Sequence, residues 1–311
     1  MAEDLKERLL QEVSKVVVGR EQEAELLLVC LLAKGHVLLE GVPGVSKTLL
    51  AKTFARCVNL RYGRVQFTPD MLPLDIIGGF IFNMKTREFD FKKGPVFTNI
   101  LLADEINRAP PKVQSALLEA MQELQVTVEG HTEALPSPFM IIATQNPIEF
   151  QGVYPLPEGQ VDRFMARVGL DYPAKPVEHT IVRHNLSKID IMDAQPVIDR
   201  SELEEAFGRV AEVKVSEEIV DYLAEFARAS RLDVRVRLGA SPRSIVHLVH
   251  CARAYAFLQG RDFVIPDDIK YLAPYVLVHR LRLDRAAIAK GGATDAYEVL
   301  KETLDKVKPP R

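Results

Sequence analysis

The sequence of 311 residues has almost no net charge, few cysteines and no long apolar run. Its 40 Lys and Arg residues nearly balance 43 Asp and Glu residues, so nothing attracts the whole chain to nucleic acid or to anionic membranes. Cys30, Cys57 and Cys251 stand far apart without the spacing of a metal site, which is typical of a reducing compartment. No apolar run approaches the roughly 20 residues that cross a bilayer, and the polar first residues do not resemble a secretory signal. We therefore expect a cytoplasmic protein without a membrane segment.

The remaining composition is that of a globular protein, with 47% hydrophobic and 27% charged residues. This length favours two domains, and the paired prolines in the segment 170–176 are the natural boundary. Before that boundary, short apolar runs alternate with helical patterns, which predicts an α/β domain at 1–172 built on a five-stranded parallel sheet with flanking helices. Beyond it, at 173–311, the pattern predicts a smaller all-α domain. The expected strands are 36–40, 63–67, 100–105, 139–143 and 164–170, and the expected C-terminal helices are 177–187, 200–210, 216–230, 242–259 and 266–279.

A glycine-bearing loop follows the first expected strand. It matches the pattern G-x-x-x-x-G-K-[ST] except at Ser46, where we expect a small residue to suffice because the backbone must approach a ligand closely. Strand, loop and helix in succession predict a phosphate cradle, whose backbone N–H groups and helix N-terminus face an anion. Lys47 would reach the β- and γ-phosphates of a nucleotide, and the Thr48 hydroxyl would ligate Mg²⁺. The alternative is a chance glycine-rich turn. The loop consists of Gly41, Val42, Pro43, Gly44, Val45, Ser46, Lys47 and Thr48.

Polar residues end two later strands of the predicted sheet. Asp104 and Glu105 follow four apolar residues, and loops at the carboxyl ends of parallel strands gather at one edge. Asp104 is placed to hold Mg²⁺ directly or through water, and Glu105 to orient and deprotonate an attacking water. Asn146, after the next strand, is placed to position that water. The alternatives are a helix start at the two acids and a turn-former before Pro147.

Two arginines stand where phosphoryl transfer needs positive charge. Arg163 precedes the last strand and Arg243 opens a helix of the second domain, and neither has a charge partner nearby in the sequence. An arginine close to the γ-phosphoryl group stabilises the negative charge that spreads over its oxygens. The alternative for each is a solvated surface charge. His247 and His250 lie at i and i+3, but no further ligand is spaced to help them bind a metal, so they indicate a partly buried helix face.

Two hairpins interrupt the alternation of strands and helices. Residues 80–83 and 88–91 are the expected arms of the first, around Met84–Arg87, and a short helix is expected at 95–99. The second spans 125–135, with Gly130 near its tip. The first hairpin carries five apolar residues that no catalytic step requires, so the core, a neighbour or a client must cover one face.

Together these residues resemble the AAA+ ATPase superfamily and, within it, the MoxR family. Gly41–Thr48 is similar to its Walker A loop, Ile100–Glu105 to Walker B, Ala143–Pro147 to sensor 1, Leu156–Phe164 to the arginine-finger segment and Ala240–Arg243 to sensor 2. Val17–Arg20 resembles the segment on the adenine side. The most family-specific stretches are 66–75 and 104–121. The resemblance implies nucleotide contacts at Val18, Gly19 and Gly41–Leu49, and identifies the hairpins as inserts of the P-loop core.

The resemblance also implies a function. It suggests a Mg²⁺-dependent ATPase that assembles as a hexameric ring and acts as a chaperone, remodelling or maturing a protein client, often with a partner that carries a von Willebrand factor A domain. A nucleic-acid motor or loader is one alternative. The first hairpin offers only a weak basic patch for it, because Glu88 and Asp90 stand among Lys85, Arg87, Lys92 and Lys93. A chelatase-type motor subunit, which inserts a metal into a small molecule, is the other.

Overall fold

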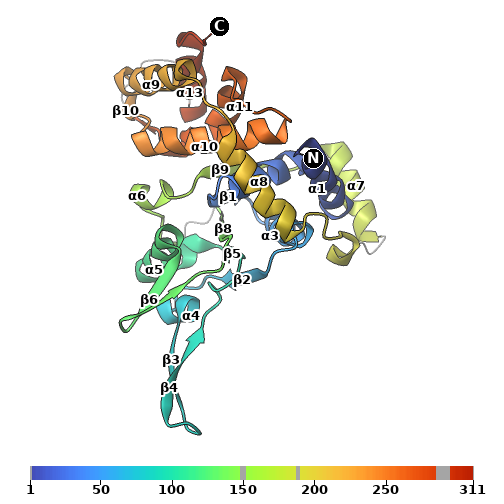
Figure 1. Cartoon of the computed structure of the whole chain (residues 1–311), viewed down its shortest axis with the longest axis vertical. Helices are drawn as coiled ribbons and strands as arrows, with labels where there is room; N and C mark the ends of the chain where they lie inside the picture. Colours follow the sequence, from blue (N-terminus) through green and yellow to red (C-terminus); the bar gives the residue numbers. More distant parts are fainter. Residues whose placement is uncertain (1, 148–151, 187–189, 285–294, 311) are drawn as a thin grey trace.

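The computed structural model describes residues 2–147, 152–186, 190–284 and 295–310. A five-stranded sheet lies at its centre, with every strand parallel and the order β2-β5-β8-β1-β9 (Figure 1). The strands are β1 (Val37–Gly41), β2 (Tyr62–Gln66), β5 (Ile100–Asp104), β8 (Met140–Gln145) and β9 (Ala166–Leu170). The predicted α/β fold is confirmed, and each strand begins and ends within two residues of its expected range.

Helices cover both faces of this sheet because successive side chains of a strand point to opposite faces. On β1, Val37 and Leu39 join the core shared with α1 (Ala2–Val16), α2 (Glu21–Leu32) and α3 (Lys47–Cys57). Leu38 joins a separate core with α5 (Pro111–Glu123). Both cores contain many side chains with no exposed surface, so the strands are held rigidly from both sides.

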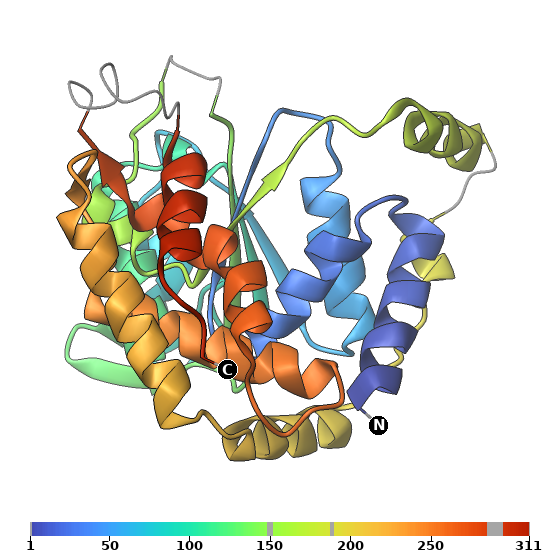
Figure 2. The same cartoon turned by 90° about the horizontal axis from the view of Figure 1, so that it is seen from above.

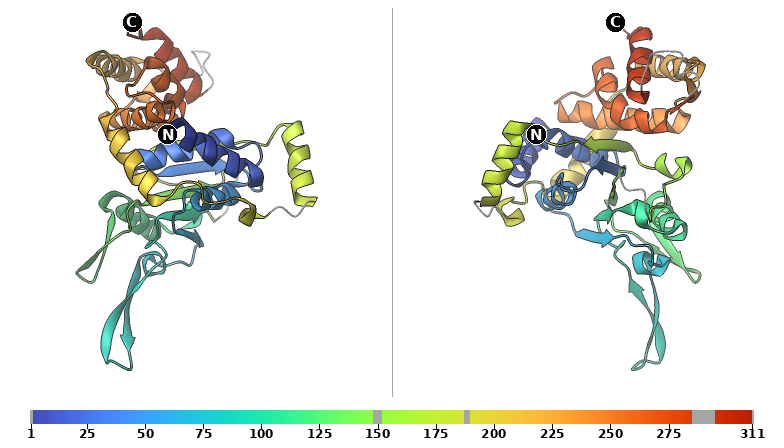
Figure 3. Two further views of the ribbon diagram at one scale, coloured as in Figure 1. Left: turned by 45° about the vertical axis from the view of Figure 1, so that its right-hand side comes forward. Right: turned by 180° about the vertical axis from the view of Figure 1, so that it is seen from behind.

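The two predicted hairpins are present. The first pairs β3 (Gly78–Asn83) with β4 (Glu88–Lys93) after the short helix α4 (Pro73–Ile77), and it projects away from the body of the molecule (Figures 1 and 3). The second pairs β6 (Gln125–Val128) with β7 (His131–Ala134). The expected helix at 95–99 is wrong. Those residues form turns, because Thr98 Oγ1 and the Asn99 N–H both donate to the Arg61 carbonyl, at 2.7 and 3.1 Å.

Helices make up most of the C-terminal part. The helices within 217–306 lie together, whereas the helix at 175–186 lies apart from them, on the side of α1 (Figures 1 and 2). Ser241 caps one of them, since its Oγ accepts from the Ser244 N–H at 3.1 Å. A short antiparallel pair of strands, which the sequence did not indicate, also lies here. The remaining elements are η1 (Ile106–Arg108), α6 (Glu158–Val161), α7 (Lys175–Leu186), η2 (Ile191–Asp193), α8 (Arg200–Glu212), α9 (Glu217–Leu232), β10 (Val236–Leu238), α10 (Pro242–Leu258), α11 (Pro266–Leu277), η3 (Val278–Arg280), β11 (Arg282–Leu283) and α13 (Ala296–Lys306).

Cys30, Cys57 and Cys251 are buried and free. In the described part of the chain, no helix has the length and apolar character needed to span a bilayer.

Candidate active site

The loop between β1 and α3 has the backbone of a phosphate cradle. Gly44 and Ser46 both take positive φ, +85° and +67°, so the loop curls around its own N–H groups. Because α3 begins at Lys47, the N-terminus of this helix, with the positive end of its dipole, directly follows the loop. The Lys47 ammonium donates to the carbonyls of Gly41 and Val42. Close approach is thus not the only requirement at position 46, because Ser46 must also hold a left-handed conformation that glycine adopts more easily.

Asp104 joins the loop to the next two strands. Its Oδ2 accepts from Thr48 Oγ1 at 3.1 Å, and its Oδ1 accepts from Thr144 Oγ1, on β8, at 2.6 Å. Arg64, on β2, donates to Oδ2 from Nη2 at 2.8 Å. Sequence reasoning missed Thr144 and Arg64, since only pairing of β2, β5 and β8 brings them here.

This oxygen pair fits Mg²⁺. A hydroxyl and a carboxylate are hard ligands, and Mg²⁺ keeps several waters and takes its other ligands from substrate phosphates. No cluster of three or more His, Cys, Asp or Glu side chains suited to a metal occurs in the described ranges. The donor set of Thr48 and Asp104 therefore suits a metal that arrives with a nucleotide.

Glu105 is held by its neighbours in an unusual backbone conformation. Its φ is +58°, and its N–H donates to Thr144 Oγ1 at 2.9 Å. Gln66 Nε2 and Arg108 Nε lie 2.7 and 2.9 Å from Oε2 of the carboxylate, which is 31% exposed. The carboxylate is thus oriented on one side and open to water on the other, as a base that acts on water must be.

Asn146 is the third strand-end residue, directly after β8. It is buried, and its carbonyl oxygen lies 3.5 Å from Asn107 Nδ2. It also lines a cleft of about 510 Å³ that extends to Arg167 on β9 and Arg282 on β11. The three strands β1, β5 and β8 therefore bring the loop, the acids and Asn146 to one edge of the sheet.

The segment around Val18 and Gly19 lies near the end of β9, the neighbour of β1 on the side away from β8. Arg20 Nη2 donates to the Asp171 carbonyl at 2.6 Å. Asp171 follows Leu170, which pairs with Gly41 at the start of the loop. Gly19 has φ +71°, and a Cβ there would come within 2.6 Å of Val177 Cγ1 on α7. Glycine is therefore required at position 19 both by conformation and by the close approach of α7.

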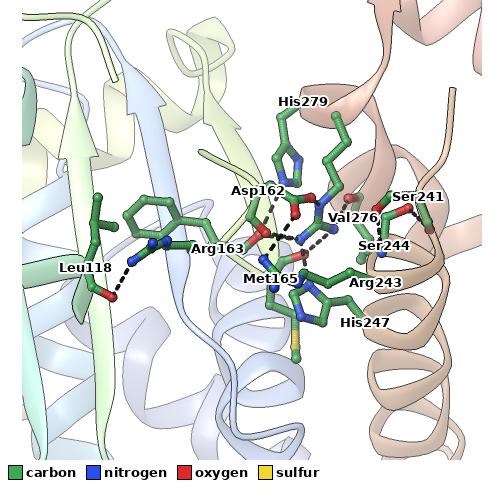
Figure 4. A network of polar contacts seen from close by, with 12 residues as sticks. Leu118, Asp162, Arg163, Met165, Ser241, Arg243, Ser244, His247, Val276 and His279 are labelled. Carbon is green, nitrogen blue, oxygen red and sulfur yellow. Dashed lines mark hydrogen bonds and ion pairs between the residues drawn. The ribbon is translucent and has the colours of Figure 1, made fainter. Parts of the chain in front are cut away.

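The two candidate arginines lie on elements other than the loop, and their side chains are on either side of Asp162 (Figure 4). Arg163 Nη1 donates to the Leu118 carbonyl of α5 at 2.9 Å, on the face of the sheet opposite α3. Arg243 Nη1 lies 3.5 Å from Asp162 Oδ2, and its side chain is 54% exposed. Arg243 thus has the charge partner that its sequence neighbourhood did not show, and this partner is the residue before Arg163.

Further residues that sequence reasoning missed surround Asp162. Arg280, from η3, donates from Nε to Asp162 Oδ1 at 2.8 Å and is almost fully buried. His247 Nδ1 lies 2.6 Å from Arg280 Nη2, and burial together with the arginine charges lowers the pKa of His247 to about 3. His247 is partly buried, as expected for this helix face, and serves as an acceptor for Arg280, whereas His250 is exposed.

Comparison with known proteins agrees with this geometry. Residues 36–166 match the ATPase family associated with various cellular activities (AAA), and residues 228–302 match the AAA lid domain. The chain is 47% identical to "Chaperone MoxR1" of Mycobacterium tuberculosis over 91% of its own length and 77% of that protein, and 44% identical to YeaC of Bacillus subtilis over 97% and 94%. The crystal structure of a candidate ATPase from Cytophaga hutchinsonii superposes with a TM-score of 0.91 at 41% identity, covering 100% of this chain and 96% of the other.

Proposed function

Because this chain belongs to the MoxR family of AAA ATPases, we propose that it binds ATP with Mg²⁺ and hydrolyses it at the edge of the sheet where β1, β5 and β8 end. One observation carries the proposal. Residues far apart in the sequence converge there, each with the chemistry that phosphoryl transfer to water requires. They are Lys47, Thr48, Asp104, Glu105 and Asn146.

Each of these residues has a distinct role in the proposed reaction. The loop N–H groups and Lys47 bind the phosphates, while Thr48 and Asp104 are the metal ligands. When bound, Mg²⁺ neutralises charge on the phosphate oxygens. Glu105, oriented by Gln66 and Arg108, accepts a proton from the attacking water, and the Asn146 amide orients that water.

The positions of Arg163 and Arg243 support assembly into a ring. Arg163 is held by the Leu118 carbonyl of α5 and Arg243 by its ion pair with Asp162, rather than at the loop of their own chain. We infer that they act on the nucleotide of a neighbouring subunit in a homo-oligomer, which we propose is a hexamer. An arginine supplied across an interface in this way stabilises the transition state strongly.

The first hairpin supports a protein as the client of this ATPase. Phe80 and Phe91 pack at its base, but Ile81, Phe82 and Phe89 are half-exposed or more, and Met84 at the tip is 86% exposed. Such an exposed apolar surface is typical of a binding site for another protein. One relative is named a chaperone, and we propose that this chain likewise remodels or matures a protein, in concert with a von Willebrand factor A domain partner.

Two substitutions test the nucleotide site. Lys47→Ala should abolish tight ATP binding, whereas Glu105→Gln should keep binding and lower turnover by about 10²- to 10⁴-fold, the usual contribution of a general base. Binding of a fluorescent ATP analogue and phosphate release would be measured side by side. Lys52→Ala, at an exposed position of α3, is the matched control and should behave as the parent. Normal ATP binding by Lys47→Ala would refute the phosphate cradle, and parent-like turnover by Glu105→Gln would refute the assignment of the base.

A further inference from the structure

A single buried arginine connects the C-terminal helices to the segment that carries Arg163. Arg280 lies in η3, directly after α11, and its side chain is only 3% exposed. Its Nε donates to Asp162 Oδ1 at 2.8 Å, and Nη1 donates to the Val276 carbonyl at 2.5 Å. Burial lowers the pKa of Arg280, and the adjacent Asp162 carboxylate opposes that effect.

Apart from the contact of Nη2 with His247 Nδ1, the remaining contacts of Arg280 go to the backbone on both sides of Arg163. Nη2 lies 3.0 Å from the Asp162 carbonyl and 2.7 Å from the Phe164 carbonyl, and Nη1 lies 3.4 Å from the Met165 carbonyl. His279, the preceding residue, places Nε2 3.2 Å from the same Phe164 carbonyl. Arg163 itself extends the other way, toward Leu118 (Figure 4). The backbone of residues 162–165 is thus fixed while the Arg163 side chain remains outside this network.

These contacts require arginine in particular. A guanidinium offers five N–H donors in a planar fork, and all of the acceptors named above surround that fork. A lysine keeps the charge but has three donors on one atom, so it cannot reach acceptors on both sides of Arg163. A buried charge is retained without large cost only when its hydrogen bonds are satisfied.

We propose that Arg280 is a positioning residue for Arg163. From the C-terminal helices it fixes the backbone of residues 162–165, so that Arg163 is presented toward the nucleotide of a neighbouring subunit. Asp162 contacts both Arg280 and Arg243, so Arg280 also helps to fix the position of Arg243. This inference rests on the proposed action of Arg163 across a subunit interface.

Mixing inactive subunits tests the inference. Arg280→Lys alone should bind ATP like the parent, because its own loop is intact, but turn over about 10- to 100-fold more slowly, the effect of a misplaced catalytic group. Mixed with Lys47→Ala, whose arginines are intact, it should regain ATPase activity. Mixed with Arg163→Ala, which needs a well-placed arginine from its neighbour, it should not.

Two controls separate failure of this inference from failure of the proposed function. A mixture of Arg163→Ala with Lys47→Ala should recover activity, and its failure would refute action across the interface. Arg261→Lys is the matched substitution in the C-terminal helices. Arg261 Nη2 lies 2.5 Å from Oδ1 of the buried Asp268 and does not contact residues 158–166. This variant should complement Arg163→Ala. If the controls succeed and Arg280→Lys also complements Arg163→Ala, or complements neither variant, Arg280 does not position Arg163.

A second variant and a second readout keep the test independent of stability. Asp162→Asn removes the carboxylate but leaves the backbone acceptors, and it should fall in the same complementation class as Arg280→Lys. In the parent protein, the N–H groups of Asp162, Arg163 and Phe164 donate to carbonyls within residues 158–161. Amide hydrogen exchange in the peptide 158–166 should therefore accelerate in Arg280→Lys. Exchange that is unchanged there, or that rises equally across β1 and α10, would overturn the inference.

Discussion

Among single residues, His36 is placed to make stability depend on pH. It is buried at the start of β1, where Nδ1 accepts from the Ile141 N–H at 3.0 Å and Nε2 lies 3.1 Å from the Met121 carbonyl. Only a neutral ring can accept at Nδ1 and donate from Nε2. Burial lowers the pKa of His36 from 6.5 to about 4, although the Met121 contact opposes this shift.

The sign of the effect follows from linkage. Between pH 6.5 and 4 the unfolded chain binds a proton at His36 and the folded chain does not, so stability is complete above pH 6.5 and is lost as the pH falls. We expect the free energy of unfolding to fall by about 1.4 kcal/mol per histidine at pH 5.5 relative to pH 7.5. His247, with a pKa lowered to about 3, acts in the same direction.

Urea unfolding of His36→Asn at both pH values checks this prediction. The Asn Oδ1 can replace Nδ1 as an acceptor but cannot be protonated in this range, so the variant should be less stable at pH 7.5 and lose less on acidification than the parent. His179→Asn, at an exposed position of α7, is the control and should lose as much as the parent. An equal loss for His36→Asn would contradict the assignment.

From the sequence, the candidate site residues could be identified, but the residues that contact them in the folded chain could not. Lys47, Thr48, Asp104, Glu105 and Asn146 could be chosen because a loop pattern and strand ends place them. Gln66, Arg64 and Thr144 could not, since their contacts with Asp104 and Glu105 arise from sheet order, which spacing in the chain does not encode. The roles given to all of these residues remain predictions.

Among the elements, the first hairpin is joined to the second at its base. The rings of Phe80 and His131 lie 5.0 Å apart, and Lys93 Nζ lies 3.1 Å from Glu133 Oε2. The second hairpin connects α5 to β8, which ends next to Asn146. The distal half of the first hairpin therefore extends from a braced base that is connected to the candidate active site.

Shortening this hairpin should separate client binding from ATP turnover. Asn83 and Glu88 form the last pair, so an Asn-Gly turn in place of Met84–Arg87 keeps the strand register. Combined with Phe82→Ser and Phe89→Ser, it should leave basal ATPase activity unchanged and abolish binding of an unfolded reporter protein in the presence of ATP. Fluorescence anisotropy of the labelled reporter measures that binding.

The outcomes of this experiment assign the hairpin. Val234→Ser, which removes an 85% exposed apolar side chain from another surface, should keep reporter binding. Unchanged reporter binding by the shortened variant would exclude the hairpin as the client site. Lost basal turnover would show that the hairpin is structural, and attention would turn to the second hairpin around Glu129–Thr132.

Element prediction succeeded where one periodicity persists over several residues. The five sheet strands are apolar runs, and the hairpins show alternation around a turn, so both could be read directly. The pair β10–β11 could not, because two very short strands more than forty residues apart have no periodicity of their own. The turn at 95–99 was missed because contacts with Arg61, not local propensity, decide its conformation.

At the scale of the whole molecule, the grouping of arginines could not be predicted. Arg163 follows Asp162 directly in the chain, whereas Arg243, at the start of α10, and Arg280, in η3, reach Asp162 only because the C-terminal helices pack against the sheet. The proposed domain division after residue 172 separates Asp162 from the two C-terminal arginines. Contacts across that division therefore hold Asp162 together with Arg243 and Arg280.

This arrangement predicts that nucleotide drives assembly. If Arg163 and Arg243 bind the phosphates held by a neighbour, ATP bridges two subunits and contributes to each interface. Glu105→Gln, which should retain ATP, is expected to form a particle with six times the mass of one chain when ATP and Mg²⁺ are added. Size-exclusion chromatography with multi-angle light scattering measures that mass.

The controls follow from the two halves of the bridged site. Lys47→Ala lacks the half that holds the nucleotide, so ATP should not increase its mass. Glu105→Gln combined with Arg163→Ala and Arg243→Ala lacks the half that faces the nucleotide, so it should bind ATP but assemble only at higher protein concentration. A monomer for Glu105→Gln at saturating ATP and Mg²⁺ would refute the ring. Equal assembly with and without the two arginines would show that they do not contribute to the interface. The contact between subunits would then not run from these arginines to the neighbour's nucleotide.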